Sequence, residues 1–158
     1  MNLDSAEFWL RVGTAILCGA AIGIERQLRG KASGVRTCIL VCLGTEVFIA
    51  LGASFPTSVA DPARVLGQVI TGIGFLGAGL ILSRDGRVLG VTSAAIIWML
   101  AGLGAAIGLG YIRAAIVLTL ITLVVLIGVE ALETLWARLR RGSADRGLEH
   151  LEIENDDH

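Results

Sequence analysis

The chain has 158 residues, of which 54% are hydrophobic and only 17% charged, and its formal net charge is −1. A soluble domain of this size could not cover so much apolar surface with the polar residues it has. The composition therefore indicates an integral membrane protein, and the near-neutral charge without a basic face argues against a nucleic-acid partner.

Five apolar stretches predict five transmembrane helices, because a bilayer core about 30 Å thick needs roughly 20 apolar residues of helix. Short connections predict antiparallel neighbours, and the need to satisfy backbone groups within lipid excludes an open sheet. The predicted fold class is therefore all-α, an integral membrane bundle of about five helices within a domain over 1–129. The spans are expected at 8–24, 35–53, 64–82, 92–109 and 112–129.

Basic residues fall mostly on one side of these spans. Ten of the thirteen follow the first, third or fifth span, and only Arg11, Arg64 and Arg113 lie on the other side. This bias predicts that the N-terminus lies outside and the C-terminus inside. The first span follows Asp4 and Glu7 rather than a basic region, so we expect it to persist as a helix instead of being cleaved as a signal peptide.

Beyond the fifth span, leucines and Trp136 recur at helical spacing beside arginines. This pattern predicts a short amphipathic helix over 130–141 that lies at the inner membrane interface. The remaining segment, 142–158, is acidic and is predicted to be a disordered tail.

The third span contains a GxGxxG pattern but lacks the preceding strand and the acidic residue of a dinucleotide site. Its glycines are instead expected to let neighbouring helices approach closely on two faces. The letters GAAIG also occur twice, at 19–23 and 104–108, and each copy is a GxxxG packing motif; with 21 glycines in the chain, we attribute the repeat to coincidence. The candidate packing glycines of the third span are Gly72, Gly74, Gly77 and Gly79.

The start of the third span is polar. Asp61 followed by Pro62 predicts a helix N-cap with proline at the first helical position. Arg64, Gln68 and Thr71 follow at spacings of four and three, and with Asp61 they form one polar stripe. Two interpretations remain open: a cap with interhelical hydrogen bonds, or the wall of a polar cavity open to the outside.

Glu46 lies roughly 10 Å inside the second span, at about the depth of Gln68. A carboxylate there costs about 2.5–3.5 kcal/mol on insertion scales, so it should be protonated, paired or hydrated. By depth, Arg64 is its expected partner. Asp61 and Glu46 are the candidate metal ligands, because Mg²⁺ binds through one or two carboxylates and retained water, although the nearby Arg64 argues against a strong cation site.

Two charges at the inner end oppose their helix dipoles. Glu25 ends the first helix and Arg36 opens the second, so an ion pair between them would compensate both. The alternative is two independent surface charges. Arg26 suits a helix C-terminus and is expected to face lipid headgroups.

Catalytic signatures are absent from the sequence. It contains no phosphate-binding loop, hydrolase elbow or zinc-protease motif, and both histidines lie in the tail. The three cysteines lie in apolar spans without metal spacing and are expected to be buried. We expect no enzymatic activity and no certain cofactor, with Mg²⁺ as the candidate ligand.

Several motifs occur together in order and spacing. They are Gly23-Ile-Glu-Arg26, Gly34-Val-Arg-Thr37, Arg64 with Gln68, the glycine-rich run 72–79, and Thr92-Ser-Ala-Ala95 with Trp98. Over residues 8–129 the chain resembles the membrane domain of the MgtC/SapB family of bacterial inner-membrane proteins. Residues that match the motif of that family are Glu25, Arg26, Arg36, Thr37, Asp61, Arg64 and Gln68.

The resemblance implies a multi-pass protein of the bacterial inner membrane, involved in magnesium homeostasis or transport. The alternative is a non-transporting regulator that binds another membrane protein through glycine-rich helix faces. Besides the lipid bilayer, a second copy of the chain in a homodimer is an expected partner. Glu46 departs from the family pattern, where a small residue is expected. The residues after Arg141 are too few for the soluble domain of larger members, so functions that need it are not expected.

Overall fold

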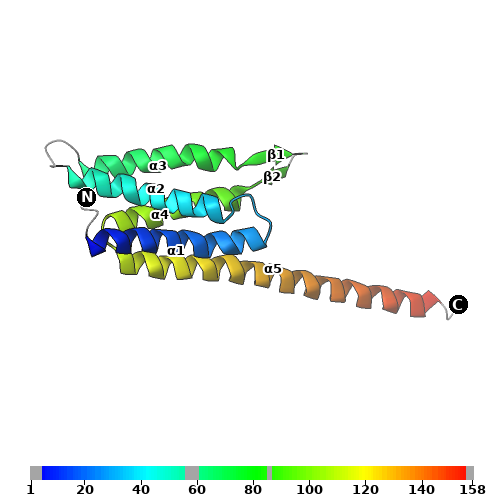
Figure 1. Cartoon of the computed structure of the whole chain (residues 1–158). Helices are drawn as coiled ribbons and strands as arrows, with labels where there is room; N and C mark the ends of the chain where they lie inside the picture. Colours follow the sequence, from blue (N-terminus) through cyan, green and yellow to red (C-terminus); the bar gives the residue numbers. More distant parts are fainter. Residues whose placement is uncertain (1–4, 56–60, 85–86, 156–158) are drawn as a thin grey trace. The chain divides into compact units, whose positions relative to one another are not determined.

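The computed structural model describes residues 5–55, 61–84 and 87–155. Residues 1–121 form one compact unit and 122–158 another. The described chain contains five helices, as the sequence predicted. Those of the first unit alternate in direction (Figure 1). Their bounds are α1 (Ala6–Leu28), α2 (Val35–Ser54), α3 (Pro62–Gly79), α4 (Val91–Gly108) and α5 (Ile112–Asn155).

Four of these helices are long and apolar enough to cross a membrane. Mean hydropathy reaches 1.4 in α1, 1.9 in α2, 1.8 in α4 and 2.6 in the Ile112–Leu132 part of α5. The apolar part of α3, Ala63–Gly79, is shorter, about 25 Å at 1.5 Å per residue, near the lower limit for a span. The multi-pass membrane fold is therefore confirmed, whereas the passage of α3 across the membrane and the orientation stay predictions.

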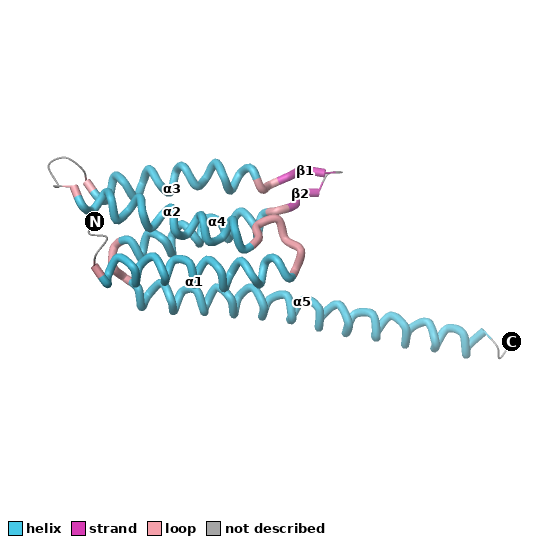
Figure 2. Tube along the Cα trace, viewed as in Figure 1, coloured by secondary structure: helices cyan, strands magenta, loops and turns pink. Residues whose placement is uncertain are grey.

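A two-stranded hairpin follows α3 (Figure 2). The sequence predicted that the third span would continue through Leu82 and that a short connection would join it to the fourth. Strand β1 (Leu82–Arg84) pairs antiparallel with β2 (Arg87–Leu89), and Leu82 lies opposite Leu89. Gly90 explains why the chain turns here: its φ of 86° is left-handed, and a Cβ on it would lie 2.0 Å from the Leu80 carbonyl oxygen. Glycine suits such a position, so the chain can turn from β2 directly into α4 beside the end of α3.

Helix starts follow the predicted chemistry where the sequence supplied it. The Asp61 carboxylate accepts a 2.9 Å hydrogen bond from the Ala63 N–H, and proline opens α3, which confirms the predicted cap. Ser5 caps α1 in the same way, accepting from the Phe8 N–H at 3.3 Å.

Helices α2 and α4 form the centre of the first unit, with α1 packed mainly on α2 and α3 mainly on α4. Both GAAIG motifs face α2. A Cβ on Gly19 would lie 2.7 Å from Ile39 Cα, and one on Gly104 would lie 2.2 Å from the Cys42 carbonyl oxygen. A Cβ on the second glycine of each motif would be similarly close to α2, 2.6 Å from Val35 Cα for Gly23 and 2.8 Å from the Glu46 carbonyl oxygen for Gly108. The two copies therefore have the same packing role, whichever way the repeat arose.

The glycines of α3 behave differently. A Cβ on Gly72, Gly74 or Gly79 would meet nothing within 4 Å, and one on Gly77 would only touch Ala94 of α4 at 3.7 Å. Among the residues that the structure describes, the predicted close packing is therefore not made at Gly72, Gly74 or Gly79. A packing role toward another chain stays a prediction.

The last helix contributes Ala115 and Thr119, both buried, to the first unit. In the second unit α5 continues as one helix to Asn155, with no break at 130 or 142. Residues 142–155 are helical where the sequence predicted a disordered tail, since leucine, glutamate and arginine favour helix and outweigh the two glycines. The interfacial position of 130–141 stays a prediction.

Candidate functional site

Buried and half-buried polar side chains gather at the hairpin end of the bundle, where α1 ends and α2 and α4 begin. We call this group the Arg26 cluster; it comprises Glu25, Arg26, Arg29, Ser33 and Ser93. Arg26 is 3% exposed, and its Nη2 donates a 2.7 Å hydrogen bond to Ser93 Oγ. The prediction that Arg26 faces lipid headgroups is therefore wrong: Ser93, in the first turn of α4, provides a buried acceptor that sequence spacing could not reveal.

Glu25 finds a different partner from the predicted one. Its carboxylate lies 2.5 Å from Arg29 Nε, one turn later in the same helix, whereas Arg36 is exposed and not paired with it. A glutamate four residues before a cation is the favourable order on a helix. The predicted Glu25–Arg36 pair is thus wrong, and Arg36 and its neighbour Thr37 point away from the protein interior.

The Arg26 cluster holds more polar atoms than its internal bonds satisfy. Glu25 Oε2, Arg26 Nε and Ser33 Oγ are buried without a hydrogen-bond partner, and Glu25 Oε1 has the ion pair with Arg29. Nearby, Gln27 Oε1 accepts from the Val35 N–H at 3.3 Å and so caps the start of α2. Because buried polar groups normally have partners, water or a contacting molecule is expected at this end.

A second polar region lies at the opposite end of α1 and α2. We call it the Glu46 pocket; it is a cavity of about 300 Å³ whose polar lining residues are Ser5, Glu7, Arg11, Glu46 and Ser54. Glu46 is 1% exposed, and its Oε2 is buried without a hydrogen-bond partner. Arg11 crosses to α4, where its Nη1 donates a 2.9 Å bond to the Gly108 carbonyl, and its Nη2 pairs with Glu7.

The charged residue that faces Glu46 is therefore Arg11, not the predicted Arg64. Both line the same cavity and interact electrostatically, while Arg64 lines a different one. Depth along α2 and α3 was a poor guide because the side chains of Glu46 and Arg64 leave different faces of the helices. Sequence reasoning missed Arg11 as a site residue, although its position four residues after Glu7 on an otherwise apolar helix was a usable signal.

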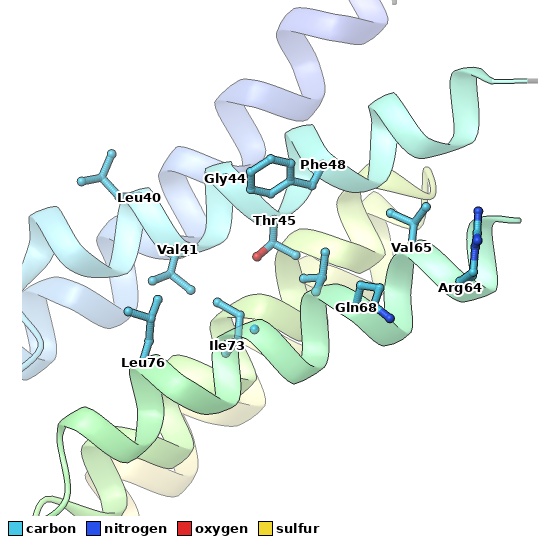
Figure 3. A pocket seen from close by; sticks show the side chains of 12 residues that line it. Leu40, Val41, Gly44, Thr45, Phe48, Arg64, Val65, Gln68, Ile73 and Leu76 are labelled. Atoms are coloured by element: carbon cyan, nitrogen blue, oxygen red, sulfur yellow. The ribbon is translucent and has the colours of Figure 1, made fainter. Parts of the chain in front are cut away.

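A long groove separates α2 from α3 (Figure 3). This α2–α3 groove has a volume of about 720 Å³ and is mostly apolar, with Arg64 and Gln68 at the end where α3 begins. Of the predicted polar stripe, Arg64 and Gln68 thus line a cavity, whereas Asp61 caps the helix and Thr71 bonds back to the Gly67 carbonyl at 2.9 Å. The cap is therefore confirmed, whereas Thr71 bonds within its own helix and the groove that Arg64 and Gln68 line is mostly apolar. A polar cavity open to the outside stays a prediction.

The two candidate metal ligands lie apart from each other. Asp61 is exposed at the start of α3, Glu46 is buried, and neither the pocket nor the groove contains both. In the part of the chain that the structure describes, no group of three or more His, Cys, Asp or Glu side chains could hold a metal. Cys18, Cys38 and Cys42 are buried free thiols, as expected. The joint metal site stays a prediction.

Four helices long and apolar enough to cross a membrane, with α1 and α4 packed through glycines on α2 and with buried charged side chains, define a multi-pass α-helical membrane protein. The family follows from comparison with known proteins. The model of the MgtC family matches residues 12–135, and the chain belongs to this family.

Relatives cover the same region. The chain is 40% identical over 129 residues to the putative magnesium transporter YhiD of Escherichia coli strain K12, covering 77% of this chain and 60% of that protein. It is 44% identical over 114 residues to MgtC of Salmonella typhimurium strain LT2 (72% and 48%) and 42% identical over 114 residues to SapB of Bacillus subtilis strain 168 (67% and 49%). It thus spans about half to three fifths of their length. No solved structure matches the chain.

Proposed function

We propose that this protein serves magnesium homeostasis in the bacterial inner membrane, as a transporter in the first instance. The observation that carries the proposal is its 40% identity over 129 residues to a protein named as a putative magnesium transporter. The Glu46 pocket supports a cation-handling role, because it places a buried carboxylate beside a cavity at one end of the bundle. The proposal includes no catalytic step and no nucleic-acid partner.

Reconstitution tests the transport form of the proposal. The full chain in liposomes that contain a magnesium-sensitive dye should give a protein-dependent rise in signal when Mg²⁺ is added outside. Glu46→Gln should slow this rise, and Arg113→Gln, an exposed change outside the pocket and the groove, should not. Empty liposomes give the leak rate. Flux equal to the leak in correctly folded protein would reject transport.

The α2–α3 groove favours a second candidate, a regulator that binds another membrane protein. The groove lies along α3, whose Gly72 and Gly79 have room for a close neighbour. Small residues let transmembrane backbones approach, so a helix of a partner, or of a second copy in a homodimer, would fit there.

Photo-crosslinking in native membranes tests the regulator. A crosslinking residue at Leu76, which lines the groove, should capture a membrane protein, and one at the exposed Leu17 of α1 serves as the matched control. Capture of the same chain would identify the homodimer. Equal labelling at both positions, or capture at neither, would reject the groove as a protein-binding surface.

A further inference from the structure

The charges in the Glu46 pocket do not balance. Glu7 and Arg11 form an ion pair, and Arg11 also donates to the Gly108 carbonyl. These contacts occupy both terminal nitrogens of Arg11 and neutralise its charge. Glu46 is left as a carboxylate in excess, buried, with Oε2 unpartnered. A buried carboxylate oxygen without a hydrogen-bond partner is costly, so something outside the chain should complete it.

We propose that the Glu46 pocket binds a small cation, which reaches it from the end of the bundle where α1 begins. Glu46 supplies the charged ligand at the bottom, and the hydroxyls of Ser5 and Ser54 line the same cavity and can contact the ion or its water. Arg11 is a positioning residue: it keeps Glu7 away from Glu46 and anchors α1 to the last turn of α4.

The shape and setting of the pocket suit a cation that keeps part of its hydration shell. A volume of about 300 Å³ holds several waters, since each occupies about 30 Å³ in the liquid. Ala50, Ala53 and Ser54 belong to the last turns of α2, where the negative end of the helix dipole favours positive charge. The positive end of α1 is offset by Glu7 in its first turn.

The choice of Mg²⁺ among the probes rests on the proposed function, whereas the site itself rests on the pocket alone. The full chain is purified in detergent at constant ionic strength set with choline chloride, and its unfolding temperature is followed while Na⁺, K⁺ or Mg²⁺ replaces choline. One of these ions should raise the unfolding temperature saturably. Glu46→Gln, which keeps the shape and removes the charge, should abolish the effect.

Glu7→Gln separates a binding role from a structural one. It frees Arg11 to neutralise Glu46, so cation affinity should fall at least tenfold although no ligand in the pocket bottom has changed. Arg64→Gln, in the separate groove, is the matched control and should bind as the unaltered chain does. Unchanged affinity in Glu7→Gln would overturn the charge argument.

A measurement on the unaltered chain covers the case in which Glu46→Gln does not fold. A hydrophobic carbodiimide modifies a carboxyl group that is buried in a membrane protein, and mass spectrometry then locates the modified residue. The bound cation should protect Glu46 saturably, at the concentration that raises the unfolding temperature. The proposal would be overturned if no ion stabilised the protein or protected Glu46, or if choline did so equally well. It would also be overturned if only acidification did so, because the occupant would then be a proton. Binding without liposome flux would count against the proposed transport and not against the site.

Discussion

The glycine-rich segments of α1 and α4 resemble that of α3 in sequence, but their glycines are tightly packed whereas most of those in α3 have open space beside them. In the GAAIG motifs, Gly19 and Gly104 press against the backbone of α2, so that even one added carbon would overlap it. In α3, a Cβ added to Gly72, Gly74 or Gly79 would meet nothing within 4 Å. A pattern of small residues shows that another helix can approach closely. Whether one does approach depends on which helix lies opposite. The chain thus has a tightly closed centre, α1–α2–α4, and a helix that leaves a groove open along α2.

The largest expected effect comes from filling the closed centre. In Gly104→Ala the new carbon would lie 2.2 Å from the Cys42 carbonyl oxygen and 2.8 Å from Thr45 Cβ, so α4 must move away from α2. Overpacking of this kind costs about 1–3 kcal/mol, and we expect the upper end in the free energy of unfolding in detergent. Gly102→Ala, on an exposed face of the same helix with nothing within 4 Å, is the control. Equal effects of both would contradict the packing difference.

Next in size is the loss of the bond that ties α1 to α4. Ser93→Ala removes the acceptor of Arg26 and leaves a buried guanidinium short of a partner, which should cost about 1–3 kcal/mol of unfolding free energy. The neighbouring Thr92→Ala changes an exposed side chain and should have little effect. Thermal unfolding of the two variants side by side is the measurement, and a Ser93→Ala protein as stable as Thr92→Ala would show that the bond contributes nothing.

Substitutions along α3, on the open side, should change the stability of the protein in the opposite direction. Gly72→Ala and Gly79→Ala add a methyl group where there is room and raise helix propensity, so the purified monomer should be unchanged or stabilised by up to about 1 kcal/mol. If a partner helix uses this face, the same changes should lower crosslinking from Leu76 in membranes. Destabilisation of the monomer would mean that these glycines already pack inside the chain.

The smallest effect concerns the pairing of Glu25. A double-mutant cycle with Arg29 should give a coupling energy of about 0.2–0.5 kcal/mol, typical of charged residues one helical turn apart. The corresponding cycle with Arg36 should give additive changes, because Arg36 is exposed and not paired with Glu25. Larger coupling to Arg36 than to Arg29 would restore the ion pair between α1 and α2 that the sequence predicted.

Local properties of the chain were readable before the fold was known. Length and hydropathy placed all five helices, the Asp61–Pro62 pair located the start of α3, and motifs in order and spacing pointed to the family. Each of these depends on residues within a few positions of one another, or on their order. The hairpin after α3 was missed because hydropathy alone continued through Leu82, while the left-handed Gly90 that forces the turn leaves no trace in an apolar average.

By itself, then, the sequence determined that this is a membrane protein of helices, where they begin, and to which family they belong. Only the tertiary structure decided the partners: Arg26 with Ser93, Arg11 rather than Arg64 facing Glu46, and both GAAIG motifs against α2. The physical reason is that burial in lipid is a property of each segment, which its composition reports. A contact between side chains depends on the rotation and distance of two helices, and these are set by all the residues that pack between them.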